Sequence, residues 1–101
     1  MTNIEPLLFN GLTKLETLFL QNNKLTRIDE GPFKTLSSLK SLLLESNNIV
    51  TFDRNALIGL SNIELVCLSN NPISILGQSI IKDICKTSPR CLVQINGECN
   101  V

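Results

Sequence analysis

Apolar and polar positions follow one another along this chain in a pattern that repeats at a fixed interval. Residues 36–49 contain five apolar positions and one asparagine: Leu36, Leu39, Leu42, Leu44, Asn47 and Ile49. The same template recurs without a gap on both sides, at Leu12, Leu15, Leu18, Leu20, Asn23 and Leu25, and at Leu60, Ile63, Val66, Leu68, Asn71 and Ile73. A fixed period of this length is typical of repeat architectures, so the pattern predicts a stack of similar units.

Each unit is predicted to contain one short strand, a turn and an irregular return segment. In residues 18–20, positions 18 and 20 face the interior and Phe19 faces the opposite side, because side chains alternate along a strand. Residues 42–44 and 66–68 repeat this arrangement. The pair Gly31-Pro32 prevents a long regular helix in the return segment. Stacking puts one strand per unit in the same direction, which predicts a parallel sheet.

The period also sets the expected boundaries. Repeats of this apolar template are predicted over residues 1–84, as a partial repeat at 1–11 and full repeats at 12–35, 36–59 and 60–83. The return segments carry two more periodic apolar columns: Ile4, Ile28, Phe52 and Leu76, and Phe9, Phe33, Leu57 and Ile81. Residues 79–86 have apolar spacing that allows a short helix. The cysteine-containing stretch 85–101 is predicted to be a closing cap. The chain begins inside a repeat, so we expect it to be a piece of a longer protein.

Composition excludes several classes of function. A length of 101 residues predicts one domain. Nine basic residues balance nine acidic ones, which argues against nucleic acid or an anionic membrane as the main partner. The longest apolar runs of three or four residues are far below the roughly 20 needed to span a bilayer. Residues 1–6 also lack the basic start of a signal peptide.

No residue type or motif in this sequence clearly indicates catalysis. The chain has no histidine, the commonest general base and metal ligand. Asp29-Glu30 is the only adjacent acidic pair, and a solvated loop is the simpler interpretation. No serine stands in a Gly-x-Ser-x-Gly turn, and no glycine-rich phosphate loop occurs. We therefore predict no enzyme activity and no cofactor.

The template resembles the leucine-rich repeat, whose pattern L-x-x-L-x-L-x-x-N-x-L stands here at positions 15–25 and recurs at positions 39–49 and 63–73. The resemblance implies an α/β right-handed solenoid, with a short parallel β-sheet on the concave face and loops or short helices on the convex face. The 24-residue length and the phenylalanine column resemble the typical extracellular subclass. Asn71-Pro72 resembles the pair that precedes a cysteine-containing C-terminal cap, but the tryptophan and the Cys-x-Cys of that cap are missing.

In the leucine-rich-repeat family, the recurring asparagine forms a ladder of hydrogen bonds to neighbouring backbone. The corresponding residues here are Asn23, Asn47 and Asn71. An asparagine amide supplies both a donor and an acceptor, and a sharply turning buried chain leaves N–H and C=O groups that need partners. We therefore expect all three asparagines to be buried and structural.

The four cysteines, Cys67, Cys85, Cys91 and Cys99, favour disulfides and an oxidising compartment. Zinc is disfavoured because the intervals between these cysteines include no Cys-x-x-Cys. If the cap continues the sheet in the 24-residue register, Cys67 and Cys91 are lateral neighbours within disulfide range, and Cys85 pairs with Cys99. If Val93 and Ile95 are the inward pair instead, the bridges are Cys85–Cys91 and Cys67–Cys99.

A binding surface is the remaining candidate for function. The predicted ligand-binding residues point outward from the strands: Thr17, Phe19, Gln21, Ser41, Leu43, Glu45 and Leu65. Phe19 beside Leu43, rimmed by Glu16 and Lys40, has the composition of a protein-binding patch. Alternatively, segments of a longer protein cover this patch, or it has no role.

We therefore expect a non-catalytic protein-recognition module of an extracellular leucine-rich-repeat protein, such as a receptor ectodomain or a secreted adhesion or immune-recognition protein. The alternative is a structural closing segment of a longer array, with the ligand bound elsewhere. An intracellular adaptor would require reduced cysteines. Ile4 and Phe9 have no preceding strand to stack on, so we also expect self-association through the uncapped N-terminal edge.

Overall fold

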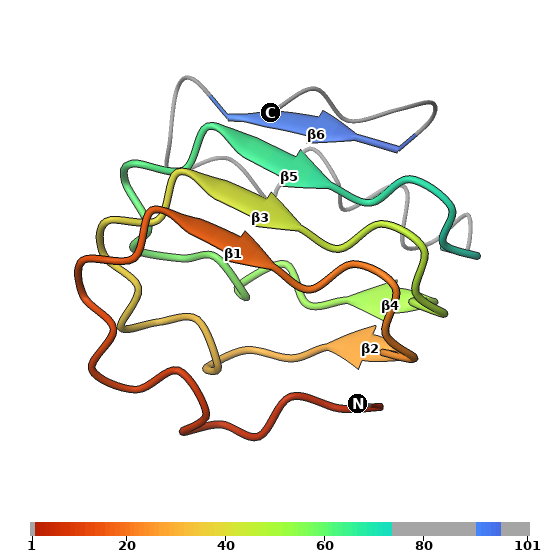
Figure 1. Ribbon diagram of the computed structural model, residues 1–101, viewed down its shortest axis with the longest axis horizontal. Helices are drawn as coiled ribbons and strands as arrows, with labels where there is room; N and C mark the ends of the chain where they lie inside the picture. Colours follow the sequence, from red (N-terminus) through yellow and green to blue (C-terminus); the bar gives the residue numbers. More distant parts are fainter. Residues whose placement is uncertain (1, 74–90, 96–101) are drawn as a thin grey trace.

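The structure, a computed structural model, describes residues 2–73 and 91–95. Six strands follow one another along the chain (Figure 1): β1 (Thr17–Phe19), β2 (Arg27–Ile28), β3 (Ser41–Leu43), β4 (Thr51–Phe52), β5 (Leu65–Cys67) and β6 (Leu92–Gln94). They form a four-stranded parallel sheet in the order β1-β3-β5-β6 and a two-stranded parallel sheet of β2 and β4. The chain thus winds as a solenoid that places one strand of the larger sheet in each turn.

The first three strands of the larger sheet pair in the predicted register. Thr17 lies opposite Ser41, and Ser41 opposite Leu65, so the lateral step equals the period of the sequence pattern. The turn after each strand repeats as well, because the residues at 22, 46 and 70 have φ angles of 61°, 57° and 60°. Asparagine stands at two of these three left-handed positions, which it tolerates better than most residues.

The return segments on the convex side consist mainly of loops, as predicted, and two short strands add to them. No helix occurs within residues 2–73 and 91–95; instead, β2 and β4 pair parallel to each other, with Ile28 opposite Phe52. Both of these side chains are buried, whereas Arg27 and Thr51 face solvent. The return segments are thus extended at Ile28 and Phe52, the positions of the apolar column whose side chains face the core. Figure 1 shows these two strands on the opposite side of the molecule from β1, β3 and β5, with their arrows reversed.

The core lies between the two sheets. Inward residues of the strands meet the return-segment columns there, and the largest side chains with almost no exposure include Phe33, Phe52, Leu25, Leu36 and Leu42. Phe9 and Phe33 stack with ring centroids 6.0 Å apart and an interplanar angle of 11°. The apolar template is therefore the scaffold that holds successive turns together.

The N-terminal edge leaves part of the template uncovered. Leu12 is 47% exposed, although Leu36 and Leu60 in the same column are completely buried. Leu7 and Leu8 are exposed beside it, and residues 11–15 line an open hollow at this edge. The column position predicts a buried Leu12, but within the described residues no turn stacks on the outer side of β1.

The sheet continues into the predicted cap, but not in the 24-residue register. β6 pairs with β5 so that Leu65 faces Leu92 and Cys67 faces Gln94, whereas the period would put Cys91 opposite Cys67. Val93 and Ile95 consequently pack against the core, which is the alternative inward pair. The last turn is three residues longer than the others. The possible helix at 79–86, the positions Leu76, Ile81, Cys85 and Cys99, and most of the proposed cap lie outside the described residues.

Candidate functional site

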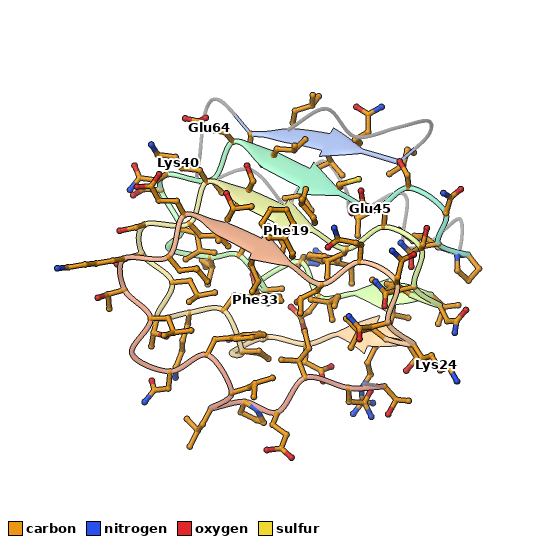
Figure 2. All side chains as sticks on the ribbon, in the orientation of Figure 1. Phe19, Lys24, Phe33, Lys40, Glu45 and Glu64 are labelled. Atoms are coloured by element: carbon orange, nitrogen blue, oxygen red, sulfur yellow. The ribbon has the colours of Figure 1, made fainter. Side chains whose placement is uncertain are left out.

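The concave face, defined here as the side of the four-stranded sheet opposite the core, presents the outward residues of the strands. The Phe19 side chain is 62% exposed, the largest exposure of any apolar residue in these strands. Figure 2 shows Phe19 and Phe33 on opposite sides of β1, with Phe33 on the side of the return segments. The other predicted ligand-binding positions on this face are half-buried: Thr17, Gln21, Ser41, Glu45 and Leu65.

Leu43 does not contribute exposed surface, which corrects the sequence-based prediction. It points outward in register with Phe19, yet its exposed fraction is only 2%. Cys67, which lies opposite Leu43 on β5, is completely buried. Neither residue belongs to the contiguous core cluster between the sheets. Alternation correctly identifies the side to which these residues point, but it does not reveal that they are covered there.

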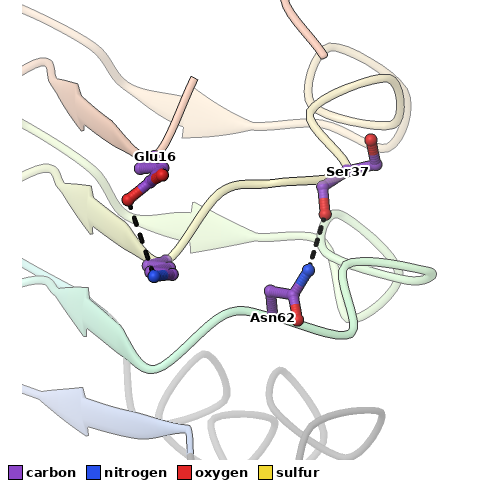
Figure 3. Close-up of polar contacts among 4 residues, drawn as sticks. Glu16, Ser37 and Asn62 are labelled. Atoms are coloured by element: carbon purple, nitrogen blue, oxygen red, sulfur yellow. Dashed lines mark hydrogen bonds and ion pairs between the residues drawn. The ribbon is translucent and has the colours of Figure 1, made fainter. Parts of the chain in front are cut away.

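Charged groups surround the exposed part of the concave face. Lys40 Nζ lies 3.5 Å from Glu16 Oε1 in an ion pair whose side chains are more than half exposed, and Figure 3 shows the Glu16 carboxylate in this contact. Glu64 continues the same column on β5. Oε1 of Glu45 is buried and has no hydrogen-bond partner among the described residues. Three carboxylates against one ammonium make this surface a poor match for phosphate groups.

Leu92 is a candidate contact residue that the sequence analysis missed. It lies opposite Leu65 on β6 and is 57% exposed. The three-residue shift of β6 puts Leu92 on the concave face and Val93 on the core side. Only the alternative register for Val93 and Ile95 could have predicted this position from the sequence.

The asparagine column makes both intra-turn and inter-turn hydrogen bonds. Asn47 Nδ2 donates to the carbonyls of Leu44 and Leu20 at 2.9 and 3.0 Å, and Asn47 Oδ1 accepts the Leu25 N–H at 3.2 Å. Asn71 repeats this set one turn later, accepting the Ile49 N–H at 3.0 Å. The asparagine therefore ties the turn after one strand to the turn after the previous strand.

Burial differs among the three ladder residues. Asn47 is 5% exposed, whereas Asn23 and Asn71 are half-buried. Asn23 bonds to the carbonyls of Leu20 and Gln21 within its own turn. No N–H group of the described residues donates to Asn23 Oδ1, and the position equivalent to the donors Leu25 and Ile49 is residue 1, outside the described residues. On the convex side, Asn62 Nδ2 adds a further inter-turn bond by donating to the Ser37 carbonyl at 3.2 Å (Figure 3).

The cysteine geometry excludes one of the predicted pairings. Cys67 and Cys91 are both disulfide-bonded. They cannot bond to each other, because Cys67 faces Gln94, three residues along the strand from Cys91. Three residues of strand span about 10 Å, beyond the roughly 4.4–6.8 Å that a disulfide allows between Cα atoms. The predicted bridge Cys67–Cys91 is therefore wrong, and the predicted bridge Cys85–Cys99 lies outside the described residues.

The features of the described residues point to binding through surface contacts. Residues 2–73 and 91–95 contain no cluster of three or more carboxylate or cysteine side chains suited to a metal ion. The same part of the chain contains no apolar helix long enough to cross a membrane. What the site supplies is a shaped surface with one exposed aromatic ring and an acidic rim.

Comparisons with known proteins agree with this architecture. A chain in the Drosophila Toll–Spatzle complex is 25% identical, with a TM-score of 0.81 over 95% of this chain and 14% of that one. A chain in the TLR13–ssRNA13 complex is 33% identical, with a TM-score of 0.76 over 86% of this chain and 12% of that one. This chain thus spans a small part of both, and no curated protein matches it. The family described as leucine rich repeat matches residues 13–73, so this chain belongs to the leucine-rich-repeat family.

Proposed function

We propose that this chain is a non-catalytic recognition segment of an extracellular leucine-rich-repeat protein and binds a protein ligand on the concave face around Phe19. The observation that carries the proposal is the 62% exposure of Phe19 on an ordered strand, where the core template does not require an aromatic residue. Rigid aromatic side chains with polar rims are enriched among the residues that dominate binding energy. The likeness to chains solved with Spatzle and ssRNA13 supports a recognition role.

Charge favours a protein ligand over RNA. The neighbours were solved with one ligand of each kind, so the fold alone does not discriminate between them. Around Phe19, the carboxylates of Glu16, Glu45 and Glu64 outnumber the ammonium of Lys40. Carboxylates repel RNA phosphates, whose neutralisation by basic residues supplies much of the affinity for nucleic acid. The exposed carboxylates of Glu16 and Glu64 are suited to N–H donors, so the ligand expected here presents lysine or arginine.

Replacing Phe19 with serine is expected to weaken ligand binding by about tenfold or more, because truncating an interface anchor typically costs at least about 1–2 kcal/mol. The chain would be screened against secreted proteins and receptor ectodomains, and the dissociation constant of a partner measured by surface plasmon resonance. Folding should be unaffected, because Phe19 lies outside the core cluster.

The matched control is Ile58→Ser, which removes an apolar side chain of 50% exposure from the return segment between β4 and β5. Equal loss of affinity in both variants, or none in Phe19→Ser, would show that the concave face is not the binding site. Comparable binding of a single-stranded RNA oligonucleotide would contradict the choice of a protein ligand.

A second candidate function is that of a structural closing segment, with the ligand bound on other turns of a longer array. The burial of Leu43 and Cys67 favours it, because a ligand on the concave face could not contact these two outward-pointing side chains. Binding of the partner to this chain alone, with the affinity that the longer protein shows, would exclude this candidate.

We also propose that the N-terminal edge mediates self-association. Leu7, Leu8 and Leu12 are exposed there at 73%, 47% and 47%, and the outer edge of β1 is not paired within the described residues. Sedimentation velocity is expected to show a concentration-dependent dimer, and Leu7→Ser/Leu8→Ser to shift it towards monomer, because exposed apolar edges favour pairing. A chain that stays monomeric at high concentration would refute this, and Ile58→Ser serves again as the control.

A further inference from the structure

The turn that contains Asn10 and Gly11 combines several features that favour reaction of an asparagine side chain with the backbone. Asn10 and Gly11 are adjacent in the sequence, and both are exposed. Gly11 has a φ angle of +87°, and no atom beyond its chain neighbours lies within 4 Å of the position that a Cβ would take. Because glycine has no side chain, nothing at this position shields the peptide bond between the two residues.

The backbone nitrogen of Gly11 is also free to react. The amides on either side of it are engaged, because Asn10 N donates to the Leu7 carbonyl at 3.1 Å and Leu12 N donates to the Phe9 carbonyl at 3.3 Å. The Gly11 N–H donates to no atom of the described residues. The turn is therefore held at both ends, while the nitrogen in its middle is not committed to a hydrogen bond there.

The other asparagines within residues 2–73 and 91–95 lack this combination, and none of them is followed by glycine. Asn47 is buried, and its amide nitrogen donates to backbone carbonyls. Asn62 is exposed, but its Nδ2 donates to the Ser37 carbonyl, and the branched side chain of Ile63 crowds the next backbone nitrogen. Asn10 is thus distinguished by both its sequence neighbour and its surroundings.

We propose that Asn10 is a site of spontaneous modification, where asparagine converts to a mixture of aspartate and isoaspartate. The Gly11 nitrogen attacks the side-chain carbonyl carbon of Asn10 and forms a C–N bond. The bond to the side-chain nitrogen breaks, and this nitrogen leaves as ammonia together with the proton from the Gly11 N–H. Water then opens the resulting cyclic imide at one of its two carbonyls, which gives aspartate or isoaspartate, and the Gly11 nitrogen regains a proton.

The isoaspartate product loosens the N-terminal edge of the stack. Its main chain runs through the former side chain, which adds one methylene group between Asn10 Cα and Gly11 N. The hydrogen bond from Leu12 N to the Phe9 carbonyl spans this point. Phe9 belongs to the core cluster and stacks on Phe33. The longer main chain therefore disturbs the turn that holds Phe9 against the next repeat.

Peptide mapping of the folded chain during incubation at mildly alkaline pH tests the reaction. Trypsin cuts after Lys14, so residues 1–14 form one peptide that contains Asn10 and, as an internal reference, the exposed Asn3 followed by Ile4. Acid forms should accumulate at Asn10 several-fold faster than at Asn3, and a methyltransferase specific for isoaspartate should label this peptide. The variant Asn10→Gln should lose the label, because the corresponding ring closes far more slowly from the longer side chain.

The same incubation in guanidinium chloride gives the reaction rate of the unfolded chain. If Asn10 reacts in denaturant but stays intact in the folded chain, the folded turn is not a modification site and the proposal is wrong. Neither measurement involves a ligand or self-association, so a failure of the proposed function would leave this result unaffected.

Hydroxyl-radical footprinting of the incubated chain tests the structural consequence. Labelling of Phe9 is expected to rise several-fold as isoaspartate accumulates, whereas Phe52, two turns away from the edge, should stay protected. Asn10→Gln, incubated for the same time, should keep Phe9 protected. If Phe9 stayed equally protected in the isoaspartate form, the modification would not loosen the N-terminal edge.

Discussion

Replacing Phe33 with alanine is expected to destabilise the chain by about 3–5 kcal/mol, the range for truncating a fully buried aromatic side chain. Phe33 has an exposed fraction of 0% and stacks on Phe9 from the preceding turn. Its loss leaves a cavity directly between two turns, where neighbouring side chains belong to separate repeats and cannot all move inward together. Urea unfolding followed by circular dichroism should show a lower midpoint with an unchanged slope.

Phe33→Leu is the matched control, because Leu57 occupies the same column in the next repeat. This smaller change is expected to cost about 1.5 kcal/mol or less. If the alanine variant lost no more stability than the leucine variant, the phenylalanine column would not be a main anchor of the stack.

Replacing Asn47 with leucine is expected to cost about 1–3 kcal/mol, the penalty for leaving one buried polar group unsatisfied. The group in question is the Leu25 N–H, which has Asn47 Oδ1 as its acceptor and belongs to a completely buried residue. The Leu20 and Leu44 carbonyls keep a donor, because Asn23 also bonds to Leu20 and Asn71 also bonds to Leu44. The loss is therefore confined to one orphaned donor, although Asn47 makes several bonds.

Asn23→Leu is the control for this prediction. Asn23 accepts no hydrogen bond from the described residues, and the Leu20 carbonyl retains Asn47 as a donor. It should therefore destabilise the chain less than Asn47→Leu in the same urea titration. Equal losses would mean that the inter-turn bond to Leu25 contributes little.

The candidate site was only partly predictable from the sequence. The outward direction of Phe19 and Leu43 follows from strand alternation, and their lateral pairing follows from the period. Their difference in exposure, 62% against 2%, could not be predicted, because both residues have the same local pattern. They differ in their place in the sheet, because β1 is an edge strand, whereas β3 lies between β1 and β5. A periodic template does not show how much of each outward side chain the folded chain buries.

The sequence by itself determined the solenoid and the inward or outward direction of the strand side chains. It also placed the strands to within one residue, because they were predicted at 18–20, 42–44 and 66–68 and lie at 17–19, 41–43 and 65–67. These follow from local chemistry, because a side-chain period of two and a fixed repeat length leave one arrangement that buries every apolar edge. Only the tertiary structure decided the register of β6, the paired strands β2 and β4, the exposure of Leu12 and the burial of Leu43 and Cys67. Each of these depends on contacts between distant segments, at an end of the stack or across its surface, where no neighbouring repeat constrains the chain.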